Sequence, residues 1–275
     1  MRNRFMFAVL TAVLGVGLII GANAFAAQKT ITIKGSTTVL PIAQSCAEVF
    51  MNKHPDINIS VQGGGSGVGI ASLMDGTCDI GNASRTAKDK EKAKAKQKGI
   101  HLYENVVAMD GIAVIVHPTN PVDGLSKAQI KAVYTGEISN WSEVGGRDQK
   151  IVIVSRDSAS GTFETFNQLA LDKAKVRPDA LLSASNRAVA MTVAKTPGAI
   201  GYVGLGYLGP SVKDLKVNGV EATEENVVNS SYSLARKLFM YTDGKPKGVV
   251  GDFIEFVLSS DGQKLVDRAG FVALQ

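Results

Sequence analysis

Residues 154–169, VSRDSASGTFETFNQL, bring together in one short stretch the groups that bind anions in proteins. Arg156 follows a run of β-branched residues, and a helical spacing of apolar residues begins just after Ser160, Gly161 and Thr162. The first N–H groups of a helix have no partner within the helix and carry partial positive charge. Arginine adds a fork-shaped cation that does not titrate. The stretch therefore predicts an oxyanion site, with Arg156 as its one indispensable full charge.

The same succession of strand, small polar loop and helix start occurs three more times. The strands are expected at residues 30–34, 57–61 and 78–82. The loops after them contain small polar residues, namely Thr37 and Thr38, then Ser66, and then Ser84. Several converging helix starts can surround a small tetrahedral oxyanion with donors. Ser, Thr and Gly also cap helices without any ligand, but four such loops, one with an arginine, favour a binding site.

Arg85 and the serines leave alternatives open. Arg85 could contact a ligand or form a structural ion pair. An exported phosphate-ester hydrolase would need Ser66 or Ser160 as nucleophile beside a base or a metal, but neither lies in a GxSxG motif or near a histidine in sequence. The glycines before Ser66 are not followed by the Lys-Ser/Thr of a nucleotide P-loop. We therefore expect a binding protein that is not an enzyme and needs no cofactor.

Residues 1–26 have the pattern of a cleaved export signal. Arg2 and Arg4 precede a long apolar run, and Ala24-Phe25-Ala26 matches the small-x-small pattern of a cleavage site. The alternative is a membrane anchor, for which the apolar run is borderline short and is not followed by a basic cluster. We expect cleavage near Ala26 and a mature protein that is soluble outside the cytoplasm.

Charge and composition argue against other classes of protein. Without the two arginines of the signal, the 30 basic residues fall to 28 against 25 acidic ones, which is a weak excess. The dense basic stretch at residues 88–98 lacks the interleaved aromatics of a nucleic-acid surface. The three histidines stand singly, so no metal site is predicted. Cys46 and Cys78 could form one disulfide after export or remain two buried thiols.

The motifs, taken together and in this order, resemble those of one protein family. GSTTV, QGGGSGVG, DIGNASR and SRDSASGTFETF are similar to the loops of the phosphate-binding proteins of bacterial high-affinity phosphate importers. GAIGYVGLGYL and the C-terminal segment that begins ARKLFMYTDGKPKG fit the same family, so the resemblance covers nearly all of the mature chain. It implies a monomeric periplasmic protein that binds inorganic phosphate and delivers it to an ABC permease in the inner membrane.

The resemblance also implies a fold. We expect an α/β, type II periplasmic-binding-protein fold with two lobes, each a mixed sheet flanked by helices, and a ligand cleft between the lobes. Residues 27–112 and 206–275 would form the first lobe and residues 113–205 the second. The apolar run at residues 105–118 would be a long strand that crosses between them. Alternating strands and helices independently favour sheets with helices on both faces.

By the same resemblance, the ligand contacts would be Thr37, Thr38, Ser66, Ser84, Arg156, Ser160, Gly161 and Thr162. Ser84 stands where some members of the family have an aspartate that accepts a proton from bound phosphate. A serine oxygen accepts without charge, so we expect a narrower preference for phosphate over sulfate. Another tetrahedral oxyanion such as sulfate is the alternative ligand. The proton could be accepted by a Ser or Thr oxygen, by a backbone carbonyl or by Asp157, although Asp157 could instead pair with Arg156 or a neighbouring lysine.

Overall fold

All four strand–loop–helix units expected from the sequence are present in the computed structural model, which describes residues 29–274. Their strands are β1 (Lys29–Gly35), β2 (Ile57–Gly63), β3 (Ile80–Ala83) and β6 (Val152–Arg156). They lead into the helices α1 (Leu40–Lys53), α2 (Ser66–Met74), α3 (Asp89–Gln97) and α5 (Gly161–Leu169). Only α3 begins clearly later than expected, at Asp89 rather than near Thr86.

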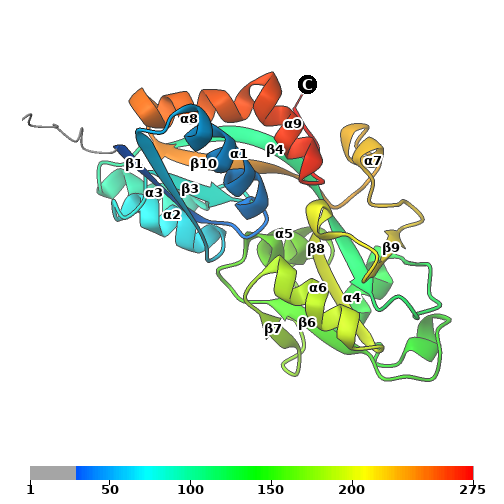
Figure 1. Ribbon diagram of the computed structural model, residues 1–275. Coiled ribbons are helices and arrows are strands. Elements are labelled where there is room, and N and C mark those ends of the chain that lie inside the picture. The colour runs from blue at the N-terminus through cyan, green and yellow to red at the C-terminus, as the bar shows by residue number, and fades with distance from the viewer. Residues whose placement is uncertain (1–28, 275) are drawn as a thin grey trace, which may run out of the picture.

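The remaining elements complete two α/β lobes (Figure 1). The other strands are β4 (Leu102–Val116), β5 (Gly124–Leu125), β7 (Leu181–Ser183), β8 (Ala199–Gly204), β9 (Lys213–Val217) and β10 (Ala235–Asp243). The other helices are α4 (Lys127–Thr135), α6 (Asn186–Lys195), α7 (Glu224–Val228), α8 (Gly248–Leu258) and α9 (Ser260–Arg268), with 3₁₀ turns at Trp141–Val144 and Leu205–Tyr207. None of the helices in the described part of the chain is long and apolar enough to span a bilayer.

In the first lobe, helices cover both faces of a mixed sheet with strand order β2-β1-β3-β10-β4. The pairs of β1 with β2 and β3 are parallel, and the pairs of β10 with β3 and β4 are antiparallel. Helices α1, α8 and α9 lie on one face, and α2 and α3 lie on the other (Figure 1). A separate cluster of buried apolar side chains fills each of these faces.

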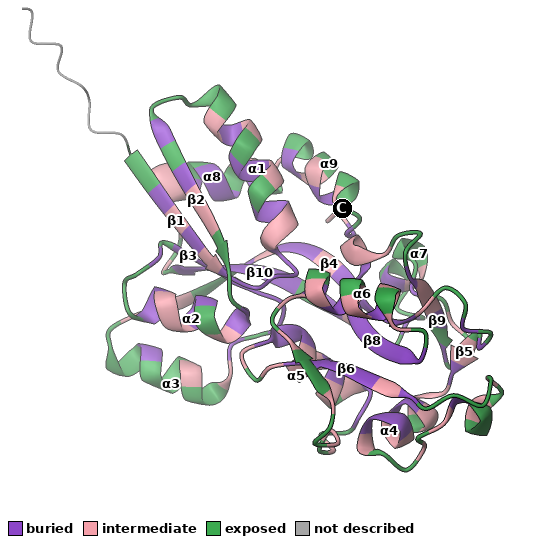
Figure 2. Cartoon of the chain, turned by 60° about the horizontal axis from the view of Figure 1, so that its bottom comes forward, coloured by how far each residue is buried: buried purple, intermediate pink, exposed green. Residues whose placement is uncertain are grey.

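The second lobe is built on the far half of β4, which is the long strand expected from the apolar run at 105–118. The first half of β4 pairs with β10, and its second half pairs with β8 and β9. Next to β8 lie β6 and then β7, all parallel to one another. β8 is buried along its whole length (Figure 2), and Phe166 of α5 stacks on its Tyr202 with ring centroids 4.0 Å apart.

The clusters of buried side chains show where each part of the chain packs. Apolar residues from Val212 to Leu234 belong to the same cluster as β6 and β8, whereas Leu238 belongs to the cluster around α1 and α8. We propose on this basis that the chain passes from the first lobe into the second near Gly111 and returns to the first lobe near residue 235. The return lies later in the chain than the boundary at residue 205 expected from the sequence. The loops after β1, β2 and β3 then face the loops after β6 and β7 across the gap between lobes.

Cys46 and Cys78 are free, buried thiols, which is the second of the two alternatives left open by the sequence. Cys46 lies on α1 within the cluster on one face of the first sheet. Cys78 precedes β3 and belongs to the cluster on the opposite face. A disulfide between them is therefore not formed, because the sheet separates the two side chains.

Candidate anion-binding site

The eight residues predicted to contact the ligand are all buried, and they come together where the two lobes meet. Thr38 Oγ1 of the first lobe lies 2.9 Å from Thr162 Oγ1 of the second. A Cβ atom added to Gly161 would lie 2.2 Å from Ser66 Oγ, so only glycine allows α5 to approach this hydroxyl so closely. The backbone N–H of Gly67 also donates to Ala159 O across the gap, at 3.0 Å. The lobes are thus closed around a shared set of hydroxyl groups.

The hydroxyl groups sit at helix starts, as the sequence pattern indicated. Ser66 is the first residue of α2. Ser160 caps α5, because its Oγ accepts the N–H of Phe163 at 3.1 Å. Ahead of α1, Ser36 Oγ accepts the N–H of Thr38 at 3.1 Å. These helix N-termini direct partial positive charge and N–H donors toward the place where the lobes meet.

Arg156 contributes a buried cation with one nitrogen left unpaired. Its side chain is held at the end of β6, because Nε donates to Ser183 O at 2.8 Å and Nη2 donates to Ala184 O at 3.1 Å. Nη1 is buried without a hydrogen-bond partner, and in residues 29–274 no carboxylate pairs with this guanidinium. Burial lowers the pKa of Arg156, but a guanidinium stays protonated in proteins. An uncompensated buried cation of this kind calls for an anion.

Asp157 forms no ion pair with Arg156 in residues 29–274, although the charge of Asp157 opposes the lowering of the Arg156 pKa by burial. Its Oδ1 accepts the N–H of Ala159 at 2.8 Å and so shapes the loop between β6 and α5. Arg85 forms structural ion pairs, which is one of the two alternatives left open by the sequence. Its guanidinium forms two hydrogen bonds with Glu91, at 2.7 and 2.8 Å, and its Nε lies 2.6 Å from Glu164 of the second lobe.

A second buried arginine, Arg236 of β10, lies in the same cluster, so Arg156 is not its only full charge. Arg236 donates to Asp110 Oδ2 from Nε at 2.9 Å and from Nη2 at 2.7 Å. It also donates to Thr162 Oγ1 at 3.1 Å and to Thr38 Oγ1 at 3.3 Å. Since Asp110 neutralises Arg236, Arg156 is the arginine whose charge remains available to a ligand.

Burial dominates the electrostatics of the Arg236–Asp110 pair. It raises the pKa of Asp110, while Arg236 and the N–H of Leu205, which donates to Asp110 Oδ1 at 2.9 Å, oppose that shift. Burial lowers the pKa of Arg236, and Asp110 opposes the shift. The sequence carried a signal for this pair, because Asp110 interrupts the apolar run of β4. Its partner could not be identified there, since the two residues lie 126 positions apart.

Asn186 is a further member of the cluster that the sequence analysis missed. It is the first residue of α6, and its Nδ2 donates to Thr37 Oγ1 and Thr38 Oγ1, both at 3.0 Å. The stretch LLSASNRA repeats the pattern of strand, small polar loop and helix start, so the signal was present. It is weak because β7 has only three residues and Leu181 and Leu182 are exposed.

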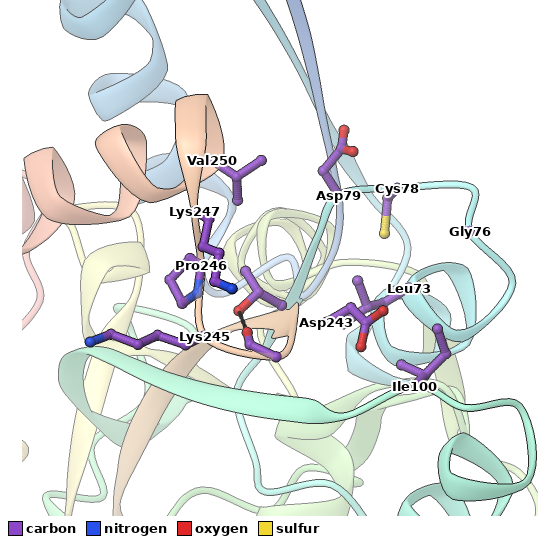
Figure 3. A pocket seen from close by; sticks show the side chains of 12 residues that line it. Leu73, Gly76, Cys78, Asp79, Ile100, Asp243, Lys245, Pro246, Lys247 and Val250 are labelled. Atoms are coloured by element: carbon purple, nitrogen blue, oxygen red, sulfur yellow. Dashed lines mark hydrogen bonds between the residues drawn. The ribbon is translucent and has the colours of Figure 1, made fainter.

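The pocket shown in Figure 3 lies away from this cluster, at the beginning of β3 and the end of β10. Its volume is ≈ 540 Å³, and none of the eight predicted ligand contacts lines it. Its two carboxylates are already paired with backbone N–H groups, Asp79 with Thr32 at 2.7 Å and Asp243 with His101 at 2.8 Å. In the part of the chain that the structure describes, no group of His, Cys, Asp or Glu residues could hold a metal ion.

Comparisons with known proteins identify the family to which the chain belongs. Residues 22–261 match the model of the PBP superfamily domain. The phosphate-binding protein PstS of Bacillus subtilis is 38% identical over 248 residues, which are 90% of this chain and 81% of the relative. A Clostridium perfringens protein assigned as a phosphate ABC transporter substrate-binding protein, solved with bound phosphate, has a TM-score of 0.83 at 39% identity and matches 90% of this chain and 100% of its own.

A second solved structure agrees with the first. An ABC-type phosphate transport receptor from Vibrio cholerae has a TM-score of 0.73 at 33% identity, and the match covers 89% of this chain and 100% of that protein. The expected architecture of two α/β lobes is thereby confirmed, and relatives of this kind are binding proteins rather than enzymes. The chain belongs to the PstS family of phosphate-binding proteins, within the PBP superfamily.

Proposed function

We propose that the protein binds inorganic phosphate between its two lobes and delivers it to the permease of an ABC-type importer. The observation that carries this proposal is the buried Arg156, whose Nη1 has no partner and whose charge no carboxylate neutralises within residues 29–274. The relatives named for phosphate binding and the phosphate-bound Clostridium perfringens protein support the same ligand.

The ligand contacts that we propose are the eight residues predicted from the sequence. Arg156 supplies the charge, and the hydroxyls of Thr37, Ser66, Ser84, Ser160 and Thr162 with the backbone of Gly161 supply neutral contacts. Thr38 belongs to the set through its bond to Thr162. Neutral donors suit this task, because many of them can surround a doubly charged anion without an equal number of buried cations.

Delivery to a permease implies a location outside the cytoplasm. The expected signal with cleavage near Ala26 lies outside the residues that the structure describes, so it remains a prediction. N-terminal sequencing of protein recovered from the periplasm tests it. A mature chain that starts near Ala27 supports export, and an intact Met1 contradicts it. We further propose a monomer that exchanges phosphate with the permease, without a role in binding nucleic acid.

Calorimetric titration tests the ligand. Phosphate-free protein titrated with phosphate should give one site, and sulfate should bind more weakly. Equal binding of sulfate would favour the alternative, a general receptor for tetrahedral oxyanions. Incubation of the same preparation with a phosphate ester, with and without added zinc, should release no phosphate, because no base lies next to Ser66 or Ser160 among their described hydrogen bonds.

A further inference from the structure

Arg236 and Asp110 lie where the two strands that connect the lobes run side by side. β4 and β10 are antiparallel here, and the pair of Asp110 with Arg236 is next in register to the pair of Gly111 with Ala235. These are the positions at which we place the passage of the chain between lobes. Only 4% of the Arg236 side chain and none of the Asp110 side chain is exposed. The buried ion pair therefore lies at the pivot between the lobes.

The guanidinium of Arg236 has a partner for each of its five N–H groups. Nε and one N–H of Nη2 donate to Asp110 Oδ2, at 2.9 and 2.7 Å. The other N–H of Nη2 donates to Thr38 Oγ1 at 3.3 Å. Nη1 donates to Ser84 O at 3.4 Å and to Thr162 Oγ1 at 3.1 Å. Because a guanidinium has five donors, Arg236 has no N–H group left for a ligand.

The partners of Arg236 other than Asp110 belong to three of the loops that form the proposed site. Thr38 precedes α1 and Ser84 follows β3, both in the first lobe, whereas Thr162 lies at the start of α5 in the second lobe. A guanidinium is planar and rigid, so it fixes the positions of these three groups relative to one another. The bond to Thr162 joins the two lobes, so it exists only when the lobes are together.

Asp110 fixes the orientation of this guanidinium. Its Oδ2 accepts two N–H groups of Arg236, and its Oδ1 accepts the N–H of Leu205 at 2.9 Å, just after β8. The neighbouring Gly204 leaves no room for a side chain, because a Cβ atom there would lie 2.9 Å from Asp110 Oδ2. The carboxylate is thus held between β10 and the end of β8.

We infer that Arg236, held by Asp110, is a positioning residue for phosphate binding. It sets where the start of α5 meets the first lobe, and it acts through Thr162 and Thr38 rather than by contact with the ligand. The inference rests on the proposed function, since it takes Thr162 as a ligand contact. When the lobes separate, Arg236 Nη1 loses Thr162, and a buried donor without a partner costs free energy. The pair therefore favours the closed form, in which phosphate is retained.

A double variant that replaces both members of the pair with apolar residues tests the inference. Such a replacement of a buried ion pair often leaves stability unchanged or raises it, so Asp110→Leu/Arg236→Met should unfold at or above the wild-type temperature. Its net charge is that of the wild type. Calorimetry should nevertheless show phosphate affinity lower by about 5- to 150-fold, as for one buried polar group that loses its partner. Stopped-flow experiments should show faster release.

Arg236→Lys separates geometry from charge. A lysine ammonium can pair with Asp110 but lacks the planar fork that joins the three loops, so phosphate should again bind about 5- to 150-fold more weakly. Tyr232→Phe is the matched control. It removes a buried hydrogen bond, from the Tyr232 hydroxyl to Ile112 O at 2.9 Å, beside the same crossover but outside the cluster. It should lower thermal stability and leave phosphate affinity within about twofold of wild type.

A double-mutant cycle asks whether Arg236 acts through Thr162. The factor by which Arg236→Lys lowers phosphate affinity should be smaller in a Thr162→Val background, by about twofold or more, because the bond between the two residues is already absent there. A structural defect unrelated to Thr162 would lower phosphate affinity by the same factor in both backgrounds.

The outcomes separate the inference from the proposed function. A wild type that binds no phosphate would overturn the proposed function. A wild type that binds phosphate, together with a folded double variant or an Arg236→Lys variant of equal affinity, would overturn the inference alone. Equal factors in the two Thr162 backgrounds would also overturn it. If the double variant does not fold, Arg236→Lys and the cycle decide the question.

Discussion

At the scale of single residues, the proposed site contains one buried cation that forms no ion pair in residues 29–274. Arg156 donates from Nε to the carbonyl of Ser183 and from Nη2 to the carbonyl of Ala184. These bonds fix the orientation of the guanidinium and leave Nη1 without a partner. Arg236 is also buried, but it is paired with Asp110 and donates to the hydroxyls of Thr38 and Thr162. The two buried arginines of the cluster are therefore distinguished by their hydrogen bonds.

Arg156→Ala should weaken phosphate binding by about 1.5–3 kcal/mol, the usual value of a hydrogen bond to a charged group. Arg156→Lys should also weaken binding. A planar guanidinium can donate to both carbonyls and to a ligand at once, whereas a lysine ammonium lacks this fork-shaped geometry. Calorimetry on each variant measures the loss, and circular dichroism verifies the fold. Arg147→Ala, at an exposed position of the second lobe, is the matched control and should bind like wild type. A loss below threefold in Arg156→Ala would remove Arg156 from the site.

The two cysteine thiols should not react with alkylating reagents in the folded protein. Burial raises the pKa of Cys46 to about 12 and that of Cys78 to about 11, so at pH 8 less than about one thiol in a thousand is the reactive thiolate. Iodoacetamide should label neither residue before unfolding and both residues after unfolding in guanidinium, as read by mass spectrometry. A chain that gains no label after unfolding and is lighter by two hydrogen atoms would instead contain a disulfide.

At the scale of elements, the start of α5 makes several of the contacts between the lobes. Gly161 and Thr162 reach the hydroxyls of the first lobe, and one turn later Glu164 forms ion pairs with Arg85 at 2.6 Å and with Lys88 at 2.5 Å. These ion pairs join the segment after β3 to α5, so they exist only when the lobes are together. They should stabilise the closed form and slow the release of the ligand.

Glu164→Gln tests this contribution. Exposed ion pairs contribute about 0.2–1 kcal/mol, and the loss of one partner from a buried pair costs about 3–5 kcal/mol. Arg85 and Glu164 are largely buried and Lys88 is partly exposed, so we expect a loss of about 1–3 kcal/mol in phosphate affinity, seen in stopped-flow experiments as faster release. Asp75→Asn breaks an exposed ion pair with Lys98 inside the first lobe and should not change the release rate. Equal effects of the two variants would refute a role in closure.

The elements were more predictable from the sequence than the contacts between them. Strand periodicity, Gly-rich loops and helical spacing located β1 to β3, β6 and the helices after them, because these signals are local. β7 was missed because three residues with two exposed leucines give no alternation to detect. Arg236 and Asp110 were missed as site residues, since their meaning depends on a tertiary contact between β10 and β4.

At the scale of the whole molecule, the protein is a pair of lobes closed over a buried polar cluster. The surface pocket of Figure 3 has ≈ 540 Å³ of space, but its lysines, Lys245 and Lys247, are exposed, whereas Arg156 is buried. The cluster contains the guanidinium without an ion-pair partner, the converging helix starts and the hydroxyls from both lobes. We propose the cluster as the binding site on the chemistry of its groups rather than on the size of a cavity.

The most direct test is a crystal structure of the protein grown with arsenate, a tetrahedral oxyanion whose heavy atom is located by its anomalous scattering. Our account predicts one strong anomalous peak within the cluster, with arsenate oxygens at hydrogen-bond distance from Arg156 Nη1 and from the hydroxyls of Thr37 and Thr162. A peak in a surface pocket, with the cluster occupied by protein groups alone, would contradict it.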